Sequence, residues 1–322
     1  MNRIIINNIG ALLLTTALVA SCNQEELPSA SGQKEVVKIT ASIGAGPGSR
    51  VTRTEDNYAF EQGDAFHIVG WYGESANTDT WFNDAVCTYS GTQWTAQPML
   101  YWQNGENLTH HFLAWYPTSF ADSKATKLDA ISFTLSGDEA TDDVLYAKWS
   151  GTQPDNNTLP LTFNHLMARF DLNLVFNSED YPTTPTGISA TIGVVKTATI
   201  NLFADSPAFI LSGKKEEVSL TGKSSPAEGM AWSGYTVVIP GQDIKACKVT
   251  LSFTADDEQK SLTYTHGESL LFQSGKRTVL NLTVNKSDVK PLEGQGTDTS
   301  GDHDFGGRGA NERRGTWGNL WE

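Results

Sequence analysis

The stretch that decides the fold is Ala168–Phe176, which reads ARFDLNLVF. Apolar side chains occupy every second position of this stretch, and Arg169, Asp171 and Asn173 stand between them. Alternation with a period of two is typical of a β-strand that turns one face to a hydrophobic core and the other face to water. The segment therefore predicts a half-buried antiparallel strand.

The same alternation recurs in other short segments, at 37–43, 131–135, 235–239, 247–253 and 278–284. Turns rich in Gly, Pro, Asn and Asp separate the segments, and no long segment has the periodicity of a helix. Many short strands of this kind indicate β-sandwiches or barrels. We therefore expect an all-β fold of antiparallel sheets.

The length and the turns suggest two sandwich domains in tandem. A turn-rich stretch at 150–157 favours a boundary near residue 160, and a boundary after the next strand is the alternative. The expected organisation is a signal segment at 1–21, a linker at 22–33, an N-terminal domain at 34–160, a C-terminal domain at 161–288 and a flexible Gly-rich tail at 289–322. Each domain would have the common size of about 100–150 residues.

The tail ends in two tryptophans, Trp317 and Trp321, which share one face if the chain there is extended. They are candidates for docking on another surface, and the alternative is an ordinary frayed terminus.

The N-terminal residues resemble the signal of an exported lipoprotein. An apolar stretch centred on residues 11–20 leads into Val19-Ala20-Ser21-Cys22, a match to the lipobox at which bacteria attach acyl chains to cysteine. Cys22 would then begin the mature chain and bind outer-membrane lipid through its acyl chains. Glu25 and Glu26 are similar to a signal for the cell surface. An incidental cysteine and a solvated linker are the alternatives.

Charge and composition exclude several classes of function. The 322 residues include 23 Lys and Arg against 37 Asp and Glu, a net charge of −14. This acid excess argues against nucleic acid as a partner. Three cysteines are too few for a disulfide scaffold, and Cys87 and Cys247 are expected to be free buried thiols.

The sequence carries no motif of catalysis or of metal binding. It has no nucleophile elbow, no phosphate-binding loop and no pair of histidines at the helical spacing of a zinc site. Adjacent His110 and His111 would point to opposite faces of a strand. We therefore expect no enzyme activity, no cofactor and no metal.

Read in order, the motifs of the chain resemble those of the fimbrillin family, surface lipoproteins of anaerobic Gram-negative bacteria of the gut and mouth. The match covers residues 18 to about 286. Its motifs are the lipobox at Cys22, VTRT at 51–54, FEQGD at 60–64, YW at 101–102, FLAWYP at 112–117, DVLYA at 143–147, FNHLMARF at 163–170 and FQSGK at 272–276.

The resemblance implies two transthyretin-like sandwiches and a structural, tip or accessory subunit of cell-surface fimbriae at the outer membrane. Its partners would be other fimbrial subunits, and adhesion to host or bacterial surface ligands is left open. In polymerising members an Arg-specific protease cuts after the first strand, and a strand from another subunit fills the groove. The displaced strand would carry Val37, Ile39, Ala41 and Ile43, and the candidate cut sites are Arg50 and Arg53. An uncut loop is the alternative.

A rival hypothesis is a surface lipoprotein that binds glycans on exposed tryptophans of the N-terminal domain. Aromatic residues are dense there, at Trp71, Trp81, Trp94, Tyr101, Trp102, Trp115, Tyr116 and Trp149. Such rings could stack on sugars, but strand aromatics more often fill a core. Exposed, coplanar rings at Trp81, Trp94 and Trp102 would favour the glycan platform.

Overall fold

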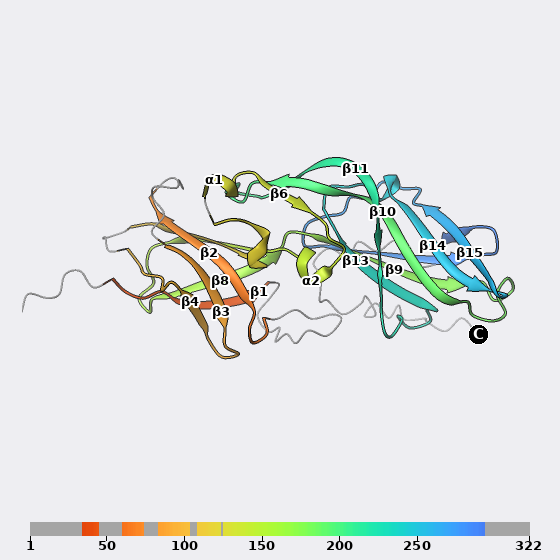
Figure 1. Cartoon of the computed structure of the whole chain (residues 1–322), viewed down its shortest axis with the longest axis horizontal. Helices are drawn as coiled ribbons and strands as arrows, with labels where there is room; N and C mark the ends of the chain where they lie inside the picture. Colours follow the sequence, from red (N-terminus) through yellow and green to blue (C-terminus); the bar gives the residue numbers. More distant parts are fainter. Residues whose placement is uncertain (1–33, 45–59, 74–82, 104–107, 124, 294–322) are drawn as a thin grey trace, which may run out of the picture. The chain divides into compact units, whose positions relative to one another are not determined.

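The computed structural model describes residues 34–44, 60–73, 83–103, 108–123 and 125–293 (Figure 1). The expected signal segment at 1–21 and linker at 22–33 lie outside these residues. The described chain consists of β-strands joined by turns and very short helices, so the all-β prediction is confirmed. None of the described helices is long and apolar enough to cross a membrane.

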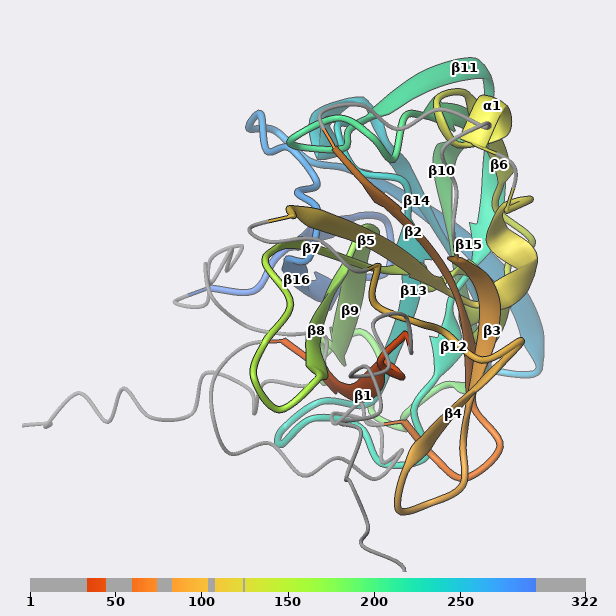
Figure 2. The ribbon, with the colours of Figure 1, turned by 90° about the vertical axis from the view of Figure 1, so that its left-hand side faces the viewer.

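The first sheet has seven strands in the order β1-β8-β7-β5-β2-β3-β4. Figures 1 and 2 both show β1 beside β8. The strands are β1 (Lys38–Ile43), β2 (Ala65–Tyr72), β3 (Asn83–Tyr89), β4 (Trp94–Gln97), β5 (His110–Tyr116), β7 (Leu145–Gly151) and β8 (Thr158–His165).

Two five-stranded sheets follow. One contains β11 (Phe209–Ser219), β10 (Thr186–Ile200), β14 (Lys248–Ala255) and β15 (Glu258–Thr265) in that order, with β6 (Ile131–Thr134) also paired to β10. The other contains β12 (Thr221–Gly222), β13 (Trp232–Val238), β9 (Ala168–Phe176), β16 (Arg277–Val284) and β17 (Val289–Pro291) in that order. The helical turns are η1 (Thr118–Phe120), α1 (Ala125–Leu128), α2 (Glu139–Asp142) and η2 (Ile244–Ala246).

The apolar alternation located strands well but did not give their direction. The quoted stretch Ala168–Phe176 is β9, and the segment 278–284 lies within β16. Most pairings are antiparallel as expected, but β1 runs parallel to β8 and β16 runs parallel to β9. Direction depends on how distant segments meet, and alternation within one strand does not encode it.

The larger hydrophobic core lies between the two five-stranded sheets. Leu172 of β9 and Leu280 of β16 are buried there with Val194 of β10 and Leu251 of β14. One face of the first sheet joins the same core through side chains such as Trp115 of β5. The opposite face of the first sheet encloses a separate, smaller core.

Strand pairing joins residues from both sides of the domain boundary predicted near residue 160. That position lies inside β8, which belongs to the first sheet, while β6 from the N-terminal half pairs with β10. The described residues all fall within one compact unit that starts at Lys34. The first sheet thus continues to His165, beyond the predicted boundary. The division into two domains stays a prediction.

The predicted tail, 289–322, begins too early. Val289–Pro291 forms β17 and pairs with β16 from Leu282 to Val284, so these residues belong to the folded sheet. Val289 is buried. Hydrogen bonds to a neighbouring strand can hold a short segment that carries little apolar surface of its own.

A buried ionic cluster lies on the second face of β9, which the alternation predicted to face water. Asp171 Oδ1 accepts a hydrogen bond from Arg169 Nε at 2.7 Å, and Asp171 Oδ2 accepts one from Arg277 Nη2 at 2.6 Å. Lys223 Nζ lies 3.2 Å from the same carboxylate, and the Arg169 guanidinium stacks over the Tyr235 ring. Burial alone would raise the pKa of Asp171, but Arg169, Arg277 and Lys223 lower it.

We expect Asp171→Asn to lower the free energy of unfolding at pH 7 by about 3–5 kcal/mol, because it leaves buried cations without a charged partner. Denaturant unfolding of the wild type and the variant measures this difference. Asp129→Asn is the matched control, because Asp129 is exposed and should change stability little. Equal free energies of unfolding for the wild type and Asp171→Asn would contradict the claim that the ionic cluster stabilises the fold.

The same variant should also alter the response to acid. The folded pKa of Asp171 is depressed, so its stabilisation is fully present above the unfolded value of about 3.9 and is lost as pH falls through the lower folded pKa. The difference between wild type and Asp171→Asn should therefore be constant from pH 7 to about pH 4 and shrink below it. Denaturant unfolding curves of the wild type and of Asp171→Asn, recorded from pH 7 to below pH 4, measure whether the stability difference shrinks as the pH falls.

Candidate functional site

The first strand closes the gap between the two ends of the seven-stranded sheet. β1 pairs with β8 at one end, from Lys38 opposite Thr158 to Ile43 opposite Phe163. The residues just before β1 pair with the chain just after β4 at the other end, where Val37 N donates to Leu100 O and Trp102 N donates to Glu35 O. β1 also lies against β4. We call the place where residues 35–43 lie between β8 on one side and the chain at 100–102 on the other the seam.

β1 presents its apolar side chains to the smaller core, as the alternation predicted. Val37 is buried, and Ile39, Ala41 and Ile43 are half-buried and pack against that core. Lys38, Thr40 and Ser42 are exposed between them. The register sets the apolar residues of β1 opposite those of β8, with Ile39 opposite Leu159 and Ala41 opposite Leu161. The strand is thus held by paired apolar faces as well as by main-chain hydrogen bonds.

Aromatic rings fill the core beneath the seam. Phe163 of β8 lies 4.9 Å from Phe66 and 5.3 Å from Phe60 between ring centroids, and Trp94 contacts both Phe60 and Phe66. Cys87 is buried and unpaired in the same core, and burial raises the pKa of its thiol to about 12. The thiol is therefore protonated at neutral pH, and the prediction of a free buried thiol is confirmed for Cys87 and also for Cys247.

β8 depends on β1 for most of its pairing. Its other neighbour, β7, meets it only at Leu145 opposite His165 and Tyr146 opposite Asn164. Without β1, the main chain of β8 from 158 to 163 would present an open edge above an apolar core. Such an edge can accept a new strand from another chain.

Asn157 connects the first strand to the loop that precedes β8. Its carbonyl oxygen accepts hydrogen bonds from Lys38 N at 2.9 Å and from Trp102 Nε1 at 3.2 Å. Its side chain donates from Nδ2 to Glu35 Oε2 at 3.1 Å and accepts from Gln153 Nε2 at 2.7 Å. Its φ of 59° is in the left-handed region, which Asn tolerates better than most residues.

The sequence did not single out Asn157, Glu35 or Leu100 as part of this site. The turn signal at 150–157 marked the loop, and an Asn before a strand is compatible with a left-handed turn residue. Nothing in local spacing indicates that this turn meets the start of β1, since the two segments lie more than a hundred residues apart, as the Asn157–Glu35 pair shows.

The tryptophans among the described residues do not form an exposed platform of the kind that the glycan hypothesis requires. Trp102 is fully buried, and Trp71 and Trp115 are buried as well. Trp94 is half-buried and packs edge-on to Phe60 in the smaller core. Trp81 lies outside the described residues. The rings at Trp94 and Trp102 are part of the core because the first sheet buries apolar side chains on both of its faces.

Several predicted site residues fall outside the described part of the chain. They are the lipidation site Cys22, the candidate cut sites Arg50 and Arg53, and the tail residues Trp317 and Trp321. Arg50 and Arg53 nonetheless lie in the segment that directly follows β1 and Gly44 in the sequence.

The histidines on β5 take structural positions. His110 is buried against the edge of Trp102, and His111 stacks on Trp71 at 5.2 Å. The two rings therefore point to opposite faces of the sheet, as predicted. Within the described ranges, His, Cys, Asp and Glu side chains form no group of three that could hold a metal ion.

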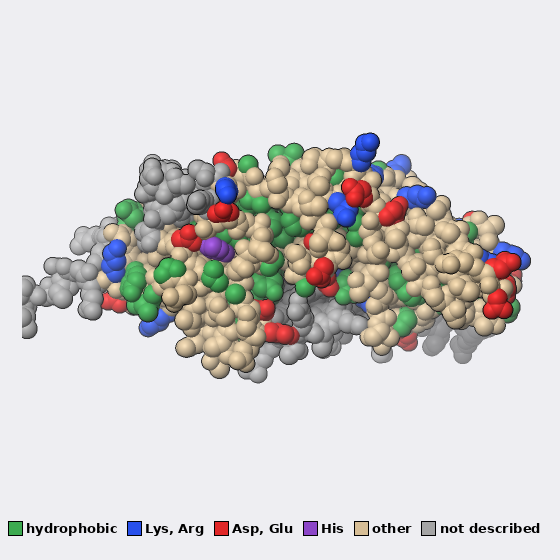
Figure 3. Space-filling view, in the orientation of Figure 1, with side chains coloured by type: hydrophobic (Ala, Val, Ile, Leu, Met, Phe, Trp, Pro, Cys, Tyr) green, Lys and Arg blue, Asp and Glu red, His purple; other side chains and the backbone are tan. Residues whose placement is uncertain are grey.

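Charge is distributed rather than concentrated on the face seen in Figure 3. Acidic and basic side chains alternate there, with apolar side chains showing between them. The acid excess of the sequence thus does not gather into a single patch on that face.

These features define an all-β protein in which the first strand is an edge strand seated over a hydrophobic core. The chain belongs to the fimbrillin-like family, whose model matches residues 50–299. The match begins after β1, at the first of the candidate cut sites. No curated protein matches the sequence.

Solved structures share the fold at low sequence identity. A cell-adhesion candidate from Bacteroides uniformis is similar with a TM-score of 0.59 and 16% identity, over 83% of this chain and 96% of that one. Another, from Bacteroides ovatus, has a TM-score of 0.54 and 16% identity, over 81% of this chain and 96% of that one. At this identity the likeness establishes the fold alone.

We expect Ile39→Ala to loosen β1 without unfolding the rest of the chain. Ile39 is half-buried, so the loss should be about 1–2 kcal/mol, below the 2–5 kcal/mol of a fully buried site. Amide exchange in β1 and along 158–163 should become roughly tenfold faster, as measured by mass spectrometry.

Thr40→Ala provides the control on the exposed face of the same strand. It should leave exchange in β1 nearly unchanged. An equal effect of both substitutions would mean that the apolar contacts of β1 do not hold it in the seam.

Proposed function

We propose that this protein is a structural, tip or accessory subunit of cell-surface fimbriae that assembles by β-strand complementation. The observation that carries the proposal is the position of β1, an edge strand that covers a hydrophobic core and pairs along β8. Membership of the fimbrillin-like family and the likeness to cell-adhesion candidates support it. The role is non-enzymatic.

In the proposed assembly step, the chain is cut after Arg50 or Arg53 and β1 leaves the seam. The half-buried side chains Ile39, Ala41 and Ile43 leave with it and uncover pockets in the smaller core. A strand from another subunit then pairs with β8 and refills these pockets. Main-chain hydrogen bonds supply affinity in such a joint, and alternate side chains supply specificity.

The contacts of β1 explain why the strand would stay in place before a cut. At its start, Val37 N donates to Leu100 O, Lys38 N donates to Asn157 O, and Glu35 accepts from Asn157 Nδ2. Its apolar side chains pack against the smaller core. Cutting the chain after β1 converts these internal contacts into contacts between two separate chains. Their stability then depends on the concentration of the released strand, so a competing strand can replace it.

The proposed location is the outside of the outer membrane, with the precursor anchored by acyl chains on Cys22. Several acyl chains on one residue supply the paired signals that stable anchoring requires. The tail tryptophans Trp317 and Trp321 are proposed to dock on a neighbouring subunit, which would make the tail an additional assembly element.

Cys22→Ala should abolish labelling of the protein with a palmitate analogue and release it from the membrane fraction. The thiol is the acceptor of the acyl chains, so no other side chain should restore the label. Cys87→Ala is the control and should leave labelling intact, because Cys87 is buried in the folded body. Undiminished labelling of Cys22→Ala would contradict the lipid anchor.

The double variant Arg50→Lys/Arg53→Lys should block processing by an Arg-specific protease and reduce the amount of polymer on the cell surface. Mass spectrometry of sheared wild-type material should find chains that begin at Val51 or Thr54. Arg308→Lys is the control, because it removes an arginine that is not a candidate cut site. It should leave processing unchanged. Assembled wild-type material that still begins at Cys22 would contradict the cut, although it would remain compatible with an anchor subunit.

A further inference from the structure

Gly44, the residue directly after β1, lies closer to β8 than a residue with a side chain could. Its N–H group donates a hydrogen bond to Phe163 O at 2.6 Å, just beyond the pair of Ile43 and Phe163 that ends the ladder between the two strands. A Cβ atom placed on Gly44 would lie 2.9 Å from Asn164 Oδ1, 3.1 Å from Thr162 Cγ2 and 3.2 Å from Phe163 O. These distances are shorter than ordinary van der Waals contact, so the position accepts only glycine unless β8 shifts.

The need for glycine at this position comes from β8 and not from the backbone of β1. The φ angle of Gly44 is outside the left-handed region that favours glycine. Glycine also has a low β propensity and loses more backbone entropy on folding than any other residue. Without the close approach of β8, a residue with a side chain would therefore be the better choice at the end of this strand.

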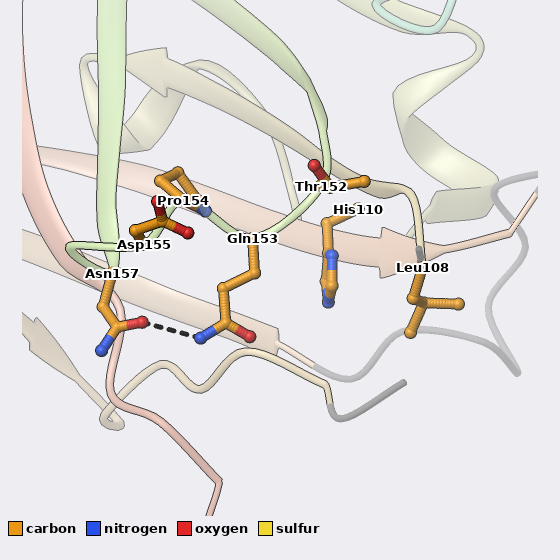
Figure 4. A pocket seen from close by; sticks show the side chains of 7 residues that line it. All are labelled: Leu108, His110, Thr152, Gln153, Pro154, Asp155 and Asn157. Atoms are coloured by element: carbon orange, nitrogen blue, oxygen red, sulfur yellow. Dashed lines mark hydrogen bonds between the residues drawn. The ribbon is translucent and has the colours of Figure 1, made fainter. Parts of the chain in front are cut away.

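The start of the first strand is fixed by main-chain N–H groups instead. Val37 N donates to Leu100 O at 2.9 Å. Lys38 N donates to Asn157 O at 2.9 Å, and the side chain of Asn157 is held by Gln153 Nε2 at 2.7 Å, as Figure 4 shows. Proline has no N–H group, so it could supply neither bond, whereas every other residue could. This end of the seam therefore excludes proline but does not otherwise select a side chain.

The crowding at Gly44 also limits the register of a strand in the seam. A slip of one residue would turn Lys38, Thr40 and Ser42 toward the smaller core, because successive side chains point to opposite faces. A slip of two residues toward the C-terminal end would keep the apolar face inward. It would also bring Ser42 to the place of Gly44, where its Cβ would be too close to Phe163 O. Both wrong registers are thus excluded.

We propose that the seam is specific for a strand that has glycine directly after its last inward-facing apolar residue, at the place of Gly44. Such a strand runs parallel to β8 and has no proline at the places of Val37 and Lys38. Its inward-facing positions are apolar, as they are in β1 at Val37, Ile39, Ala41 and Ile43. This inference rests on the proposed function, because it defines which strand of another subunit can enter the seam.

The test uses the full chain with the recognition sequence of a site-specific protease inserted after Ser49, so that cutting does not depend on Arg50 or Arg53. A fluorescent peptide with the sequence of residues 35–44, EVVKITASIG, is added to the cut chain. It should replace β1 in the seam, and the fluorescence anisotropy of the peptide should rise. Unlabelled variants of the same peptide then compete with it.

The Gly44→Val peptide should bind about tenfold more weakly than the unchanged peptide, because the added side chain overpacks the contact with β8. The Gly44→Ala peptide should fall between the two. This order is the reverse of that given by β propensity alone. The Thr40→Val peptide is the matched control and should bind at least as tightly as the unchanged peptide, since Thr40 is exposed. The Lys38→Pro peptide should not compete, because it lacks the N–H group that donates to Asn157 O.

The same position is tested in the uncut chain. Gly44→Val should make amide exchange in β1 and along 158–163 roughly tenfold faster. Gly267→Val is the control, because no heavy atom lies within 4 Å of a Cβ placed on Gly267, and it should exchange in these segments as the wild type does. Thermal unfolding of both variants checks the fold. The peptides test the proposal in either case, because they bind to a body without substitutions.

Equal or tighter binding of the Gly44→Val peptide would overturn the proposal, and so would failure of the unchanged peptide to enter the cut chain. Wild-type exchange rates in Gly44→Val would mean that β8 yields to a side chain, which also overturns it. Absence of polymer from cells, with the preference for glycine intact, would contradict the proposed function alone. Polymer on cells without that preference would contradict this inference alone.

Discussion

The structure depends on the closure of the first sheet at the seam. β8 has only a short pairing with β7, so its main chain and the core behind it require a strand on the other side. β1 meets this requirement by pairing from Lys38 to Ile43 and by turning Ile39 and Ala41 inward. Since unpaired main-chain groups over an exposed apolar core are costly, the seam has to be occupied.

This constraint does not demand that the occupying strand belong to the same chain. The position of β1 at the end of the sheet differs from that of β9, which lies between β13 and β16 and carries the buried cluster of Arg169 and Asp171. Removing β9 would break its pairings with both β13 and β16. It would also remove Arg169 and Asp171 and so leave the remaining buried cations of the cluster without their carboxylate. Removing β1 breaks one main pairing and leaves a vacancy that another strand can fill, which is the physical basis for assembly through the seam.

Local sequence pattern predicted the strands because alternation is a property of single segments. It failed for features that arise when segments meet. Arg169 and Asp171 were expected to face water, but cations from β16 and from the residues after β12 neutralise Asp171 and allow its burial. Trp102 and Trp115 are buried because the first sheet has a core on each face, and Val289 folds because β16 offers it a partner.

The sequence by itself determined the all-β class, the positions of most strands and the apolar face of β1, because these follow from the period of the side chains. It also supplied the motifs that resemble the family. Only the tertiary structure decided that β1 runs parallel to β8 and that Asn157 ties Glu35 and Lys38 to the loop before β8. Each of these depends on contacts between distant segments, which local periodicity does not encode.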